Sequence, residues 1–134
     1  MEPGLRDGEK ILVEELTPRF SKVSRGDILV FRHPRNPDRY LIKRVVGLAG
    51  ETVEIRRGRL YVDGKRLREW YLPESYLDSS DLSPIRLGDA EFFVMGDHRD
   101  DSEDSRSWGP LRRGLVVGRA MVAYWPPSAA SYLR

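Results

Sequence analysis

The sequence YLIKRVV at residues 40–46 is the stretch that decides the expected fold. It combines an aromatic residue with aliphatic and β-branched residues, which is the composition of a β-strand. Because side chains alternate between the two faces of a strand, Lys43 projects on the opposite side from Ile42 and Arg44. The stretch therefore predicts a long strand that carries one lysine among large apolar residues.

Further strands are expected on both sides of this stretch, because short apolar runs alternate there with turn sequences. The turns include RGD at residues 25–27, RG at 57–58 and DG at 63–64, and the last two are typical of β-hairpins. No long window shows the apolar periodicity of a helix. We therefore predict a mainly β fold in which coiled antiparallel sheets form a barrel-like domain. The runs expected as strands are residues 11–13, 28–31, 40–46, 53–56, 60–62, 65–67, 92–95, 115–117 and 120–125.

Residues 66–88 differ in composition from the rest of the chain. They hold Trp70, Tyr71 and Tyr76, together with prolines and a cluster of serine and aspartate. We expect this segment to be a small cap or insertion with little regular structure. It would belong to a single domain that spans residues 1–134, a length that is ordinary for one domain.

The composition argues against several classes of function. Lys and Arg number 23 and Asp and Glu 21, a net charge of +2 with alternating signs, so no nucleic-acid partner is expected. The chain has no cysteine, which excludes disulfides and a thiolate nucleophile. His33 and His98 have no partner at metal-site spacing, so no metal site is expected. No apolar run reaches the length of about 20 residues that a membrane span needs.

Lys43 admits two interpretations from the pattern alone. A lysine beside an apolar wall has a lowered pKa and can act as a general base near neutral pH. Alternatively, the side chain points to solvent and Lys43 is an ordinary surface residue of the strand. The pattern leaves both open.

The sequence GDHRDDSEDSR at residues 96–106 is the second candidate feature, because it gathers acids, arginines and serines directly after an expected strand. Asp and Ser favour turns by bonding to nearby backbone groups, so the segment can be a solvated loop held by ion pairs. Polar loops at strand ends also carry the functional sites of β folds. This choice, too, stays open from the pattern.

Taken in order, these features resemble the type I signal peptidase family, membrane-anchored serine proteases that use a serine/lysine dyad. The resemblance spans nearly the whole chain and rests on four boxes with sensible spacing. The boxes are MEPGL at residues 1–5, RGDILVF at 25–31, IKRVVGLAGE at 42–51 and the sequence at 96–106, with WG at 108–109, VGRA at 117–120 and WPP at 125–127 continuing the pattern.

The resemblance implies a role for each matching residue. Lys43 matches the general base, and Ser102 matches the serine that orients it. Asp104 and Arg106 match an ion pair that shapes the loop, for which Gly96, Asp97 and Arg99 provide the frame. The residues that match the lining of the substrate clefts are Met1, Leu5, Ile11, Val30, Tyr40, Leu41 and Ile42.

The implied function is that of a serine endopeptidase that removes N-terminal signal peptides from exported preproteins after an Ala-x-Ala-like motif. Its partners would be signal peptides and the membrane surface. The full-length protein would lie in the bacterial plasma membrane with its catalytic domain on the outer face. The expected mechanism is that neutral Lys43 activates a serine, which forms an acyl-enzyme, while a backbone N–H stabilises the oxyanion. This implied mechanism needs neither a metal nor an organic cofactor.

The nucleophilic serine of the family box stands directly before the residue that matches Met1. We therefore expect the chain as given to lack the nucleophile and to be inactive. No other serine is a natural replacement, because Ser21, Ser24, Ser102 and Ser105 all belong to other parts of the family pattern. Our preferred interpretation is that Met1 is an internal methionine of a longer protein.

Three other functions remain as alternatives. The chain can be a serine-less pseudoprotease that binds signal peptides, a self-cleaving repressor-type peptidase of the same serine/lysine class, or a structural β domain. One departure from the family pattern also bears on the chemistry, because Asp101 replaces an asparagine beside Ser102. A carboxylate facing Lys43 would raise its pKa, so we predict that Asp101 points away.

Overall fold

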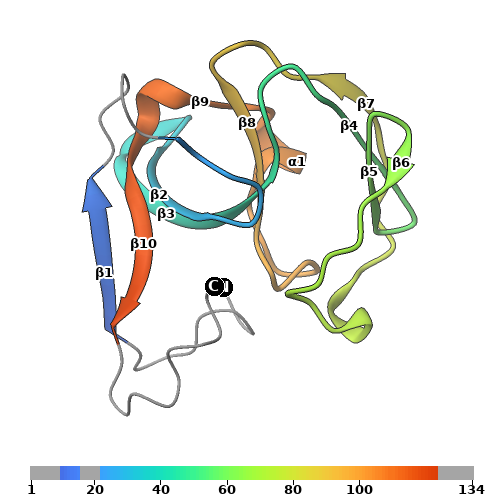
Figure 1. Ribbon diagram of the computed structural model, residues 1–134, viewed down its shortest axis with the longest axis horizontal. Helices are drawn as coiled ribbons and strands as arrows, with labels where there is room; N and C mark the ends of the chain where they lie inside the picture. Colours follow the sequence, from blue (N-terminus) through green and yellow to red (C-terminus); the bar gives the residue numbers. More distant parts are fainter. Residues whose placement is uncertain (1–9, 16–21, 124–134) are drawn as a thin grey trace.

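The computed structural model describes residues 10–15 and 22–123, and their backbone forms two antiparallel sheets side by side (Figure 1). The larger sheet has the strand order β1-β10-β2-β3-β8-β9, and the smaller one the order β6-β5-β4-β7. The strands are β1 Lys10–Glu15, β2 Ile28–His33, β3 Asn36–Gly47, β4 Thr52–Arg56, β5 Arg59–Val62, β6 Lys65–Arg66, β7 Leu82–Arg86, β8 Glu91–Met95, β9 Leu111–Arg112 and β10 Val116–Ala123.

Three short helical turns complete the described part of the chain. They are η1 (Glu74–Tyr76), α1 (Ser105–Trp108) and η2 (Arg113–Leu115). The predicted mainly β fold of antiparallel sheets is confirmed. The two sheets stay open and do not close into a barrel in the described residues.

The long strand predicted around residues 40–46 is β3, which occupies the middle of the larger sheet. It pairs with β2 on one side, where Leu29 lies opposite Lys43, and with β8 on the other, where Met95 lies opposite Arg44. The chain leaves β8 directly into residues 96–106. If the register of β3 and β8 is continued by one residue, Gly96 comes to lie opposite Lys43.

Two apolar clusters hold the sheets together. One lies within the larger sheet and includes Leu29, Phe31 and Val45, all closed to solvent. The other belongs to both sheets, because it joins residues of β3 and β8 to residues of β4 and β5. Its fully or nearly buried members are Val46, Val53, Ile55, Leu60, Val62, Leu87, Phe93 and Met95.

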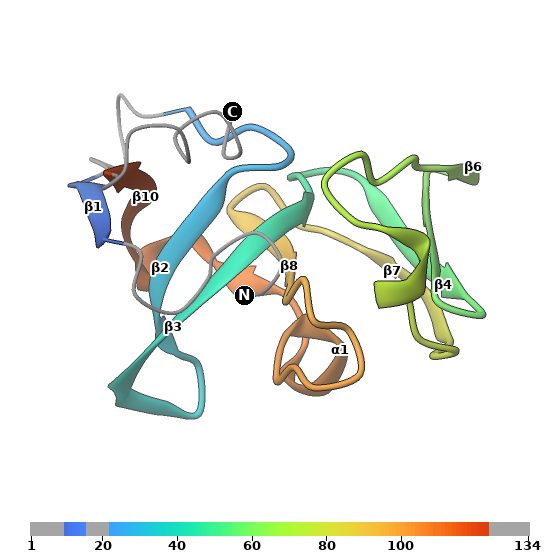
Figure 2. The same ribbon diagram turned by 90° about the horizontal axis from the view of Figure 1, so that it is seen from below.

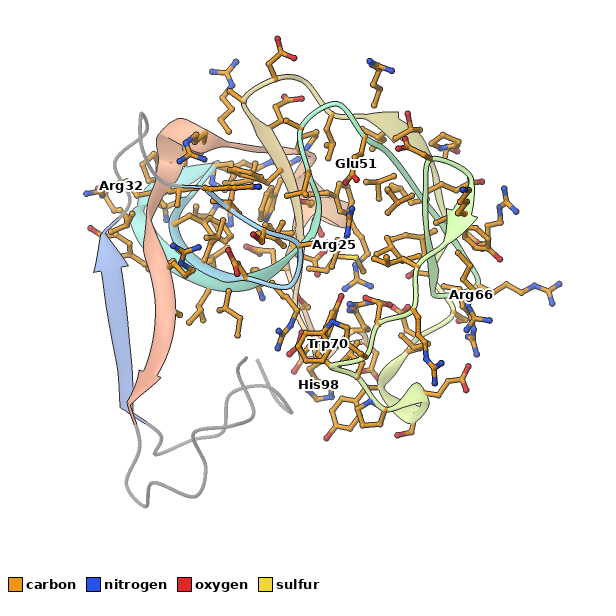
Figure 3. All side chains as sticks on the ribbon, in the orientation of Figure 1. Arg25, Arg32, Glu51, Arg66, Trp70 and His98 are labelled. Atoms are coloured by element: carbon orange, nitrogen blue, oxygen red, sulfur yellow. The ribbon has the colours of Figure 1, made fainter. Side chains whose placement is uncertain are left out.

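A polar contact also bridges the region between the sheets. Arg25 and Glu51 point toward one another there (Figure 3), with Arg25 Nη1 and Nη2 at 2.8 and 2.6 Å from the two carboxylate oxygens. Arg25 Nη1 also donates to the carbonyl oxygen of Val46 at 3.0 Å. The turn before β2 is thereby fixed to the turn after β3.

Segment 66–88 is more regular than its composition predicts. Its first part contains η1, but its last part forms β7, which pairs with β4 so that Ile85 lies opposite Val53. The prediction of little regular structure was therefore wrong for residues 82–86. Pro84 concealed the strand, and it is tolerated because β7 is an edge strand whose outer side needs no N–H donor.

The end of the fold also differs in detail from the expected strands. Residues 115–117 and 120–125 were predicted as separate strands, whereas β10 runs without interruption from Val116 to Ala123. An irregularity between Val116 and Gly118 absorbs the break that the glycine suggested. Residues 124–125 lie outside the described residues.

Candidate active site

The Lys43 ammonium group, the Ser102 hydroxyl and the Asp104 carboxylate form a continuous hydrogen-bonded chain. Lys43 Nζ donates to Ser102 Oγ at 3.1 Å, and Ser102 Oγ lies 2.8 Å from Asp104 Oδ2. Since a carboxylate only accepts, the hydroxyl proton of Ser102 is directed to Asp104. Ser102 therefore accepts a hydrogen bond from Lys43 and does not donate one to it.

Asp104 owes its position to the helix that follows it. It is the N-cap of α1, and its Oδ1 accepts the backbone N–H of Arg106 at 3.0 Å, as capping aspartates do. Its Oδ2 accepts the backbone N–H of Gly96 at 3.0 Å. The carboxylate thus ties the first residue of the loop to its last turn, which brings Ser102 over β3.

The charge of Asp104 is compensated although the side chain is closed to solvent. Arg106 Nε and Nη2 donate to its two oxygens, each at 2.9 Å. Burial alone would raise the pKa of Asp104, but the hydrogen bonds and the charge of Arg106 outweigh it, and the pKa is lowered. Asp104 is therefore ionised at neutral pH and is a firm acceptor for Ser102.

The pKa of Lys43 is lowered, and burial of its ammonium group is the main cause. Three carboxylates oppose this shift, in decreasing order Asp104, Glu103 and Asp101, whereas the guanidinium of Arg106 supports it. The lysine is thus poorly solvated and placed beside a polar partner. A lysine in this state can lose its proton more readily than a surface lysine and can act as a base.

The loop is further held by two buried ion pairs on its outer side. Asp97 accepts two hydrogen bonds from Arg44, at 3.0 and 2.8 Å, in a pair that is almost completely closed to solvent. Arg99 forms a buried ion pair with Glu69 and donates from Nε to the carbonyl oxygen of Gly96 at 2.8 Å. These contacts fix the backbone on which Ser102 and Asp104 stand.

This arrangement can be compared with known proteins through the sequence. The family described as "Signal peptidase, peptidase S26" matches residues 1–125. The chain belongs to the peptidase S26 family of signal peptidases. Lys43, Ser102 and Asp104 all lie within the matched range, on the strand and loop that carry the resemblance.

Individual S26 relatives match over nearly the whole chain. A probable signal peptidase I-2 of Synechocystis is 35% identical over 133 residues, which cover 94% of this chain and 59% of the relative. The signal peptidase I of Leptolyngbya laminosa is 38% identical over 136 residues, or 94% of this chain and 64% of the relative. The chain thus spans about three fifths of the length of these two relatives.

A solved S26 structure shares the fold as well. The crystal structure of a signal peptidase I from Enterococcus faecalis superimposes with a TM-score of 0.64 at 32% sequence identity. The match covers 74% of this chain and 97% of the Enterococcus chain. The fold of this chain is therefore shared with a signal peptidase I over about three quarters of its length.

The structure brings together one set of predicted site residues. Lys43, Ser102, Asp104 and Arg106 are linked through side-chain hydrogen bonds, and Gly96 contributes through its backbone. Asp97 and Arg99 have no described hydrogen bond with Lys43; they bind Arg44 and Glu69 instead, and their role as the frame of the loop stays a prediction.

The predicted substrate-binding residues do not form one described cluster. Met1 and Leu5 lie outside the described residues, and of Ile11 only the backbone pairing with Val122 is described. The strand register places Val30 opposite Ile42 and thus on one face. The remaining two differ in environment, since Leu41 packs against the apolar cluster of the larger sheet whereas Tyr40 is 54% exposed.

A cavity of about 590 Å³ lies beside segment 66–88 and not at Lys43. Its lining mixes the arginines Arg59, Arg66 and Arg68 with leucines and two glutamates. Of the predicted substrate-binding residues whose side chains are described, namely Val30, Tyr40, Leu41 and Ile42, none lines it. The assignment of the substrate cleft to those residues therefore stays a prediction.

Several residues of the site were missed by the sequence reasoning. Arg44 is 2% exposed, although the pattern made it only the neighbour of the lysine, and its guanidinium stacks on the ring of Tyr71 at 4.2 Å. The Tyr71 hydroxyl donates to Glu69 at 2.9 Å. An arginine inside an apolar strand was the available signal, because a buried guanidinium requires an acidic partner.

Residues 10–15 and 22–123 contain no helix that is long and apolar enough to cross a membrane. Within the same ranges, no group of histidine and acidic side chains is arranged to hold a metal ion.

Proposed function

We propose that this chain is the catalytic part of a serine endopeptidase that removes signal peptides from exported preproteins. The observation that supports it is the partly buried Lys43, whose Nζ lies 3.1 Å from Ser102 Oγ and whose pKa is lowered, in a chain of the S26 family. A structural β domain would have no need for a lysine in this state. The same geometry is what a lysine general base requires.

In the proposed reaction, neutral Lys43 accepts the proton of a serine hydroxyl. The serine oxygen attacks the peptide carbonyl carbon, the leaving amine takes the proton, and an acyl-enzyme remains. Lys43 then takes a proton from water, which attacks the ester, and gives this proton to the serine oxygen as the ester bond breaks. Ser102 orients the lysine throughout, because its own proton is committed to Asp104.

We expect the nucleophile to be a serine directly before the residue that is Met1 here. Ser102 is poorly suited to this task, since its hydroxyl is held between Lys43 and Asp104. The substrate class that we propose is the signal peptide with small residues one and three positions before the cut. The proposed location is the outer face of the bacterial plasma membrane, where such peptides emerge.

The test is cleavage of a peptide with an Ala-x-Ala motif by a chain that is extended by one serine before Met1, called here the serine-extended chain. It should cleave after the motif, and its Lys43→Ala variant should lose activity by at least about 10³-fold. Binding of the peptide without cleavage by the serine-extended chain would contradict the proposal. That outcome would favour the pseudoprotease, which binds signal peptides but does not cut them.

A further inference from the structure

Segment 67–81 connects β6 to β7 and contacts the loop 96–106 through two ion pairs. Glu69 pairs with Arg99, and Asp78 pairs with Arg106. Trp70 of the segment and His98 of the loop are seen at the same end of the molecule (Figure 3), and the rings of Tyr76 and His98 lie 5.8 Å apart. The view from below shows the same segment beside the loop that leads into α1 (Figure 2). The candidate active site is therefore bordered by the segment that connects β6 to β7 of the smaller sheet.

Asp78 provides the contact that lies nearer to Lys43. Arg106 Nη1 donates to Asp78 Oδ2 at 2.9 Å, while Arg106 Nε and Nη2 donate to Asp104. Arg106 Nη2 also donates to the carbonyl oxygen of Arg99 at 2.8 Å. The guanidinium is thus held from three sides, and the side chains of Arg106 and Asp78 are only 13% and 19% exposed.

Asp78 is itself held in place by its surroundings. Its Oδ1 accepts hydrogen bonds from the backbone N–H and the hydroxyl of Ser80, at 3.2 and 2.7 Å. Gly58, in the turn between β4 and β5, packs so tightly on it that a Cβ there would lie 1.9 Å from the Asp78 carbonyl oxygen. Gly58 N–H also donates to Ser80 at 2.7 Å. Asp78 therefore presents a fixed carboxylate to Arg106.

We propose that Asp78 is a positioning residue for the Lys43 base, which acts by holding the guanidinium of Arg106 against Asp104. The order of contacts is Asp78, Arg106, Asp104, Ser102 and Lys43, each joined to the next by a hydrogen bond. The segment between β6 and β7 thereby contributes to the geometry of the site. The inference rests on the proposed function of Lys43 as a base and adds a residue to it.

The charges around Lys43 determine in which direction its pKa should change when Asp78 is removed. Asp104, Glu103 and Asp101 favour its ammonium form, and Arg106 opposes it. Without Asp78, the guanidinium is less firmly held, so it neutralises Asp104 less and repels the ammonium less. The pKa of Lys43 should therefore rise toward its ordinary value.

The first test follows the titration of Lys43 by NMR of its Cε and Nζ in the chain as it is. Asp78→Ala should raise the apparent pKa by about half a pH unit. Asp78→Asn, which keeps the size of the side chain and an acceptor oxygen, should raise it by less and serves if the alanine variant does not fold. Asp81→Ala is the matched control, because Asp81 lies in the same segment but accepts from Arg57 N–H and has no described contact with Arg106.

An unchanged Lys43 titration in both Asp78 variants, or an equal shift in Asp81→Ala, would overturn the proposal. The second test uses the serine-extended chain, in which Asp78→Ala should lower kcat about 10-fold with KM nearly unchanged. The same substitution should cost nothing further in an Arg106→Met background, since it acts through Arg106. A full further loss there would also count against the proposal.

The two tests distinguish failure of the positioning role of Asp78 from failure of the proposed function on which it rests. If no serine-extended variant cleaves the peptide but Asp78→Ala still shifts the titration of Lys43, the proposed function fails and the positioning by Asp78 holds. If the peptide is cleaved and Asp78→Ala changes neither the titration nor kcat, the function holds and the positioning by Asp78 fails.

Discussion

A methyl group on Gly96 would lie 2.0 Å from the hydroxyl oxygen of Ser102 and 3.3 Å from the Nζ of Lys43. The backbone at this position therefore passes so close to the pair that no side chain fits without displacing it. The constraint is steric, and it explains why the loop leaves β8 at a glycine.

Gly96→Ala should consequently disturb Ser102 more than it disturbs the fold. We expect the serine-extended chain to lose about 10²-fold in kcat/KM, because a displacement of about 1 Å at a catalytic group has that effect. Gly114→Ala is the matched control, since no atom lies within 4 Å of a Cβ built there. Equal activity of the two variants in the peptide cleavage assay would show that Ser102 tolerates the displacement.

Ser102 and Ser105 should differ sharply although both are serines of the same loop. Ser102→Ala removes the partner of Lys43 and should lower kcat about 10- to 100-fold with little change in stability. Ser105 Oγ accepts the buried N–H of Val94 at 2.9 Å. Ser105→Ala should therefore cost about 1–3 kcal/mol of unfolding free energy.

Kinetics and urea unfolding of the two variants measure this contrast. The titration of Lys43 should change in Ser102→Ala and remain as it is in Ser105→Ala. If Ser102→Ala leaves kcat unchanged, Ser102 has no orienting function.

Lys43→Met should stabilise the fold while abolishing catalysis. The pKa of Lys43 is lowered from 10.5, so the folded state disfavours the ammonium form. This cost is complete at pH values below the folded pKa, and it disappears as the pH rises toward the ordinary value of the unfolded chain. Methionine fills a similar volume without charge.

Thermal unfolding at several pH values checks the sign of this effect. The Tm of Lys43→Met should exceed that of the parent by roughly 2–5 °C near neutral pH, and the difference should shrink above about pH 10. A difference that grows with pH would mean that the fold favours the charged lysine.

Asp97→Asn should be among the most damaging substitutions that do not touch Lys43. It leaves the guanidinium of Arg44 buried without its carboxylate, and breaking such a pair costs about 3–5 kcal/mol. Glu54→Gln breaks the pair with Arg56, whose side chain is 57% exposed, and should cost far less, because water screens an exposed ion pair. Urea unfolding of both variants makes the comparison, and similar losses would contradict the assigned difference in burial.

Asp101 gives a prediction about pH dependence. It is exposed, and its charge affects Lys43 less than the charges of Asp104, Glu103 and Arg106. The sequence-based expectation that Asp101 points away from Lys43 stays a prediction. Asp101→Asn should leave the acid limb of the pH–rate profile of the serine-extended chain in place, and a shift of that limb to lower pH would show that Asp101 faces the lysine.

The sequence predicted the parts of the fold that depend on local pattern. The stretch 40–46 was expected as a strand and lies within β3, because its aromatic, aliphatic and β-branched residues favour a strand. The hairpin of β4 and β5 follows from its turn at residues 57–58 in the same way. These elements carry their information within a few neighbouring residues.

The parts that depend on distant partners were not predictable from pattern. Asp78 belongs to a serine- and aspartate-rich stretch that looks solvated, and only the fold brings it to Arg106, which is 28 residues away. Glu69 likewise forms its ion pair with Arg99, which is 30 residues away in the sequence. For Lys43, the pattern left both solvent exposure and burial open until Ser102, 59 residues later, was placed beside it.

The apolar cluster shared by the two sheets limits how this domain can be shortened. Val46, Phe93 and Met95 of the larger sheet are covered by Val53 and Leu60 of the smaller one. A reduced protein in which residues 48–90 are replaced by a tight turn would expose these three side chains to water. Such a miniature would need a new apolar cover over β3 and β8 before its lysine could be kept out of water.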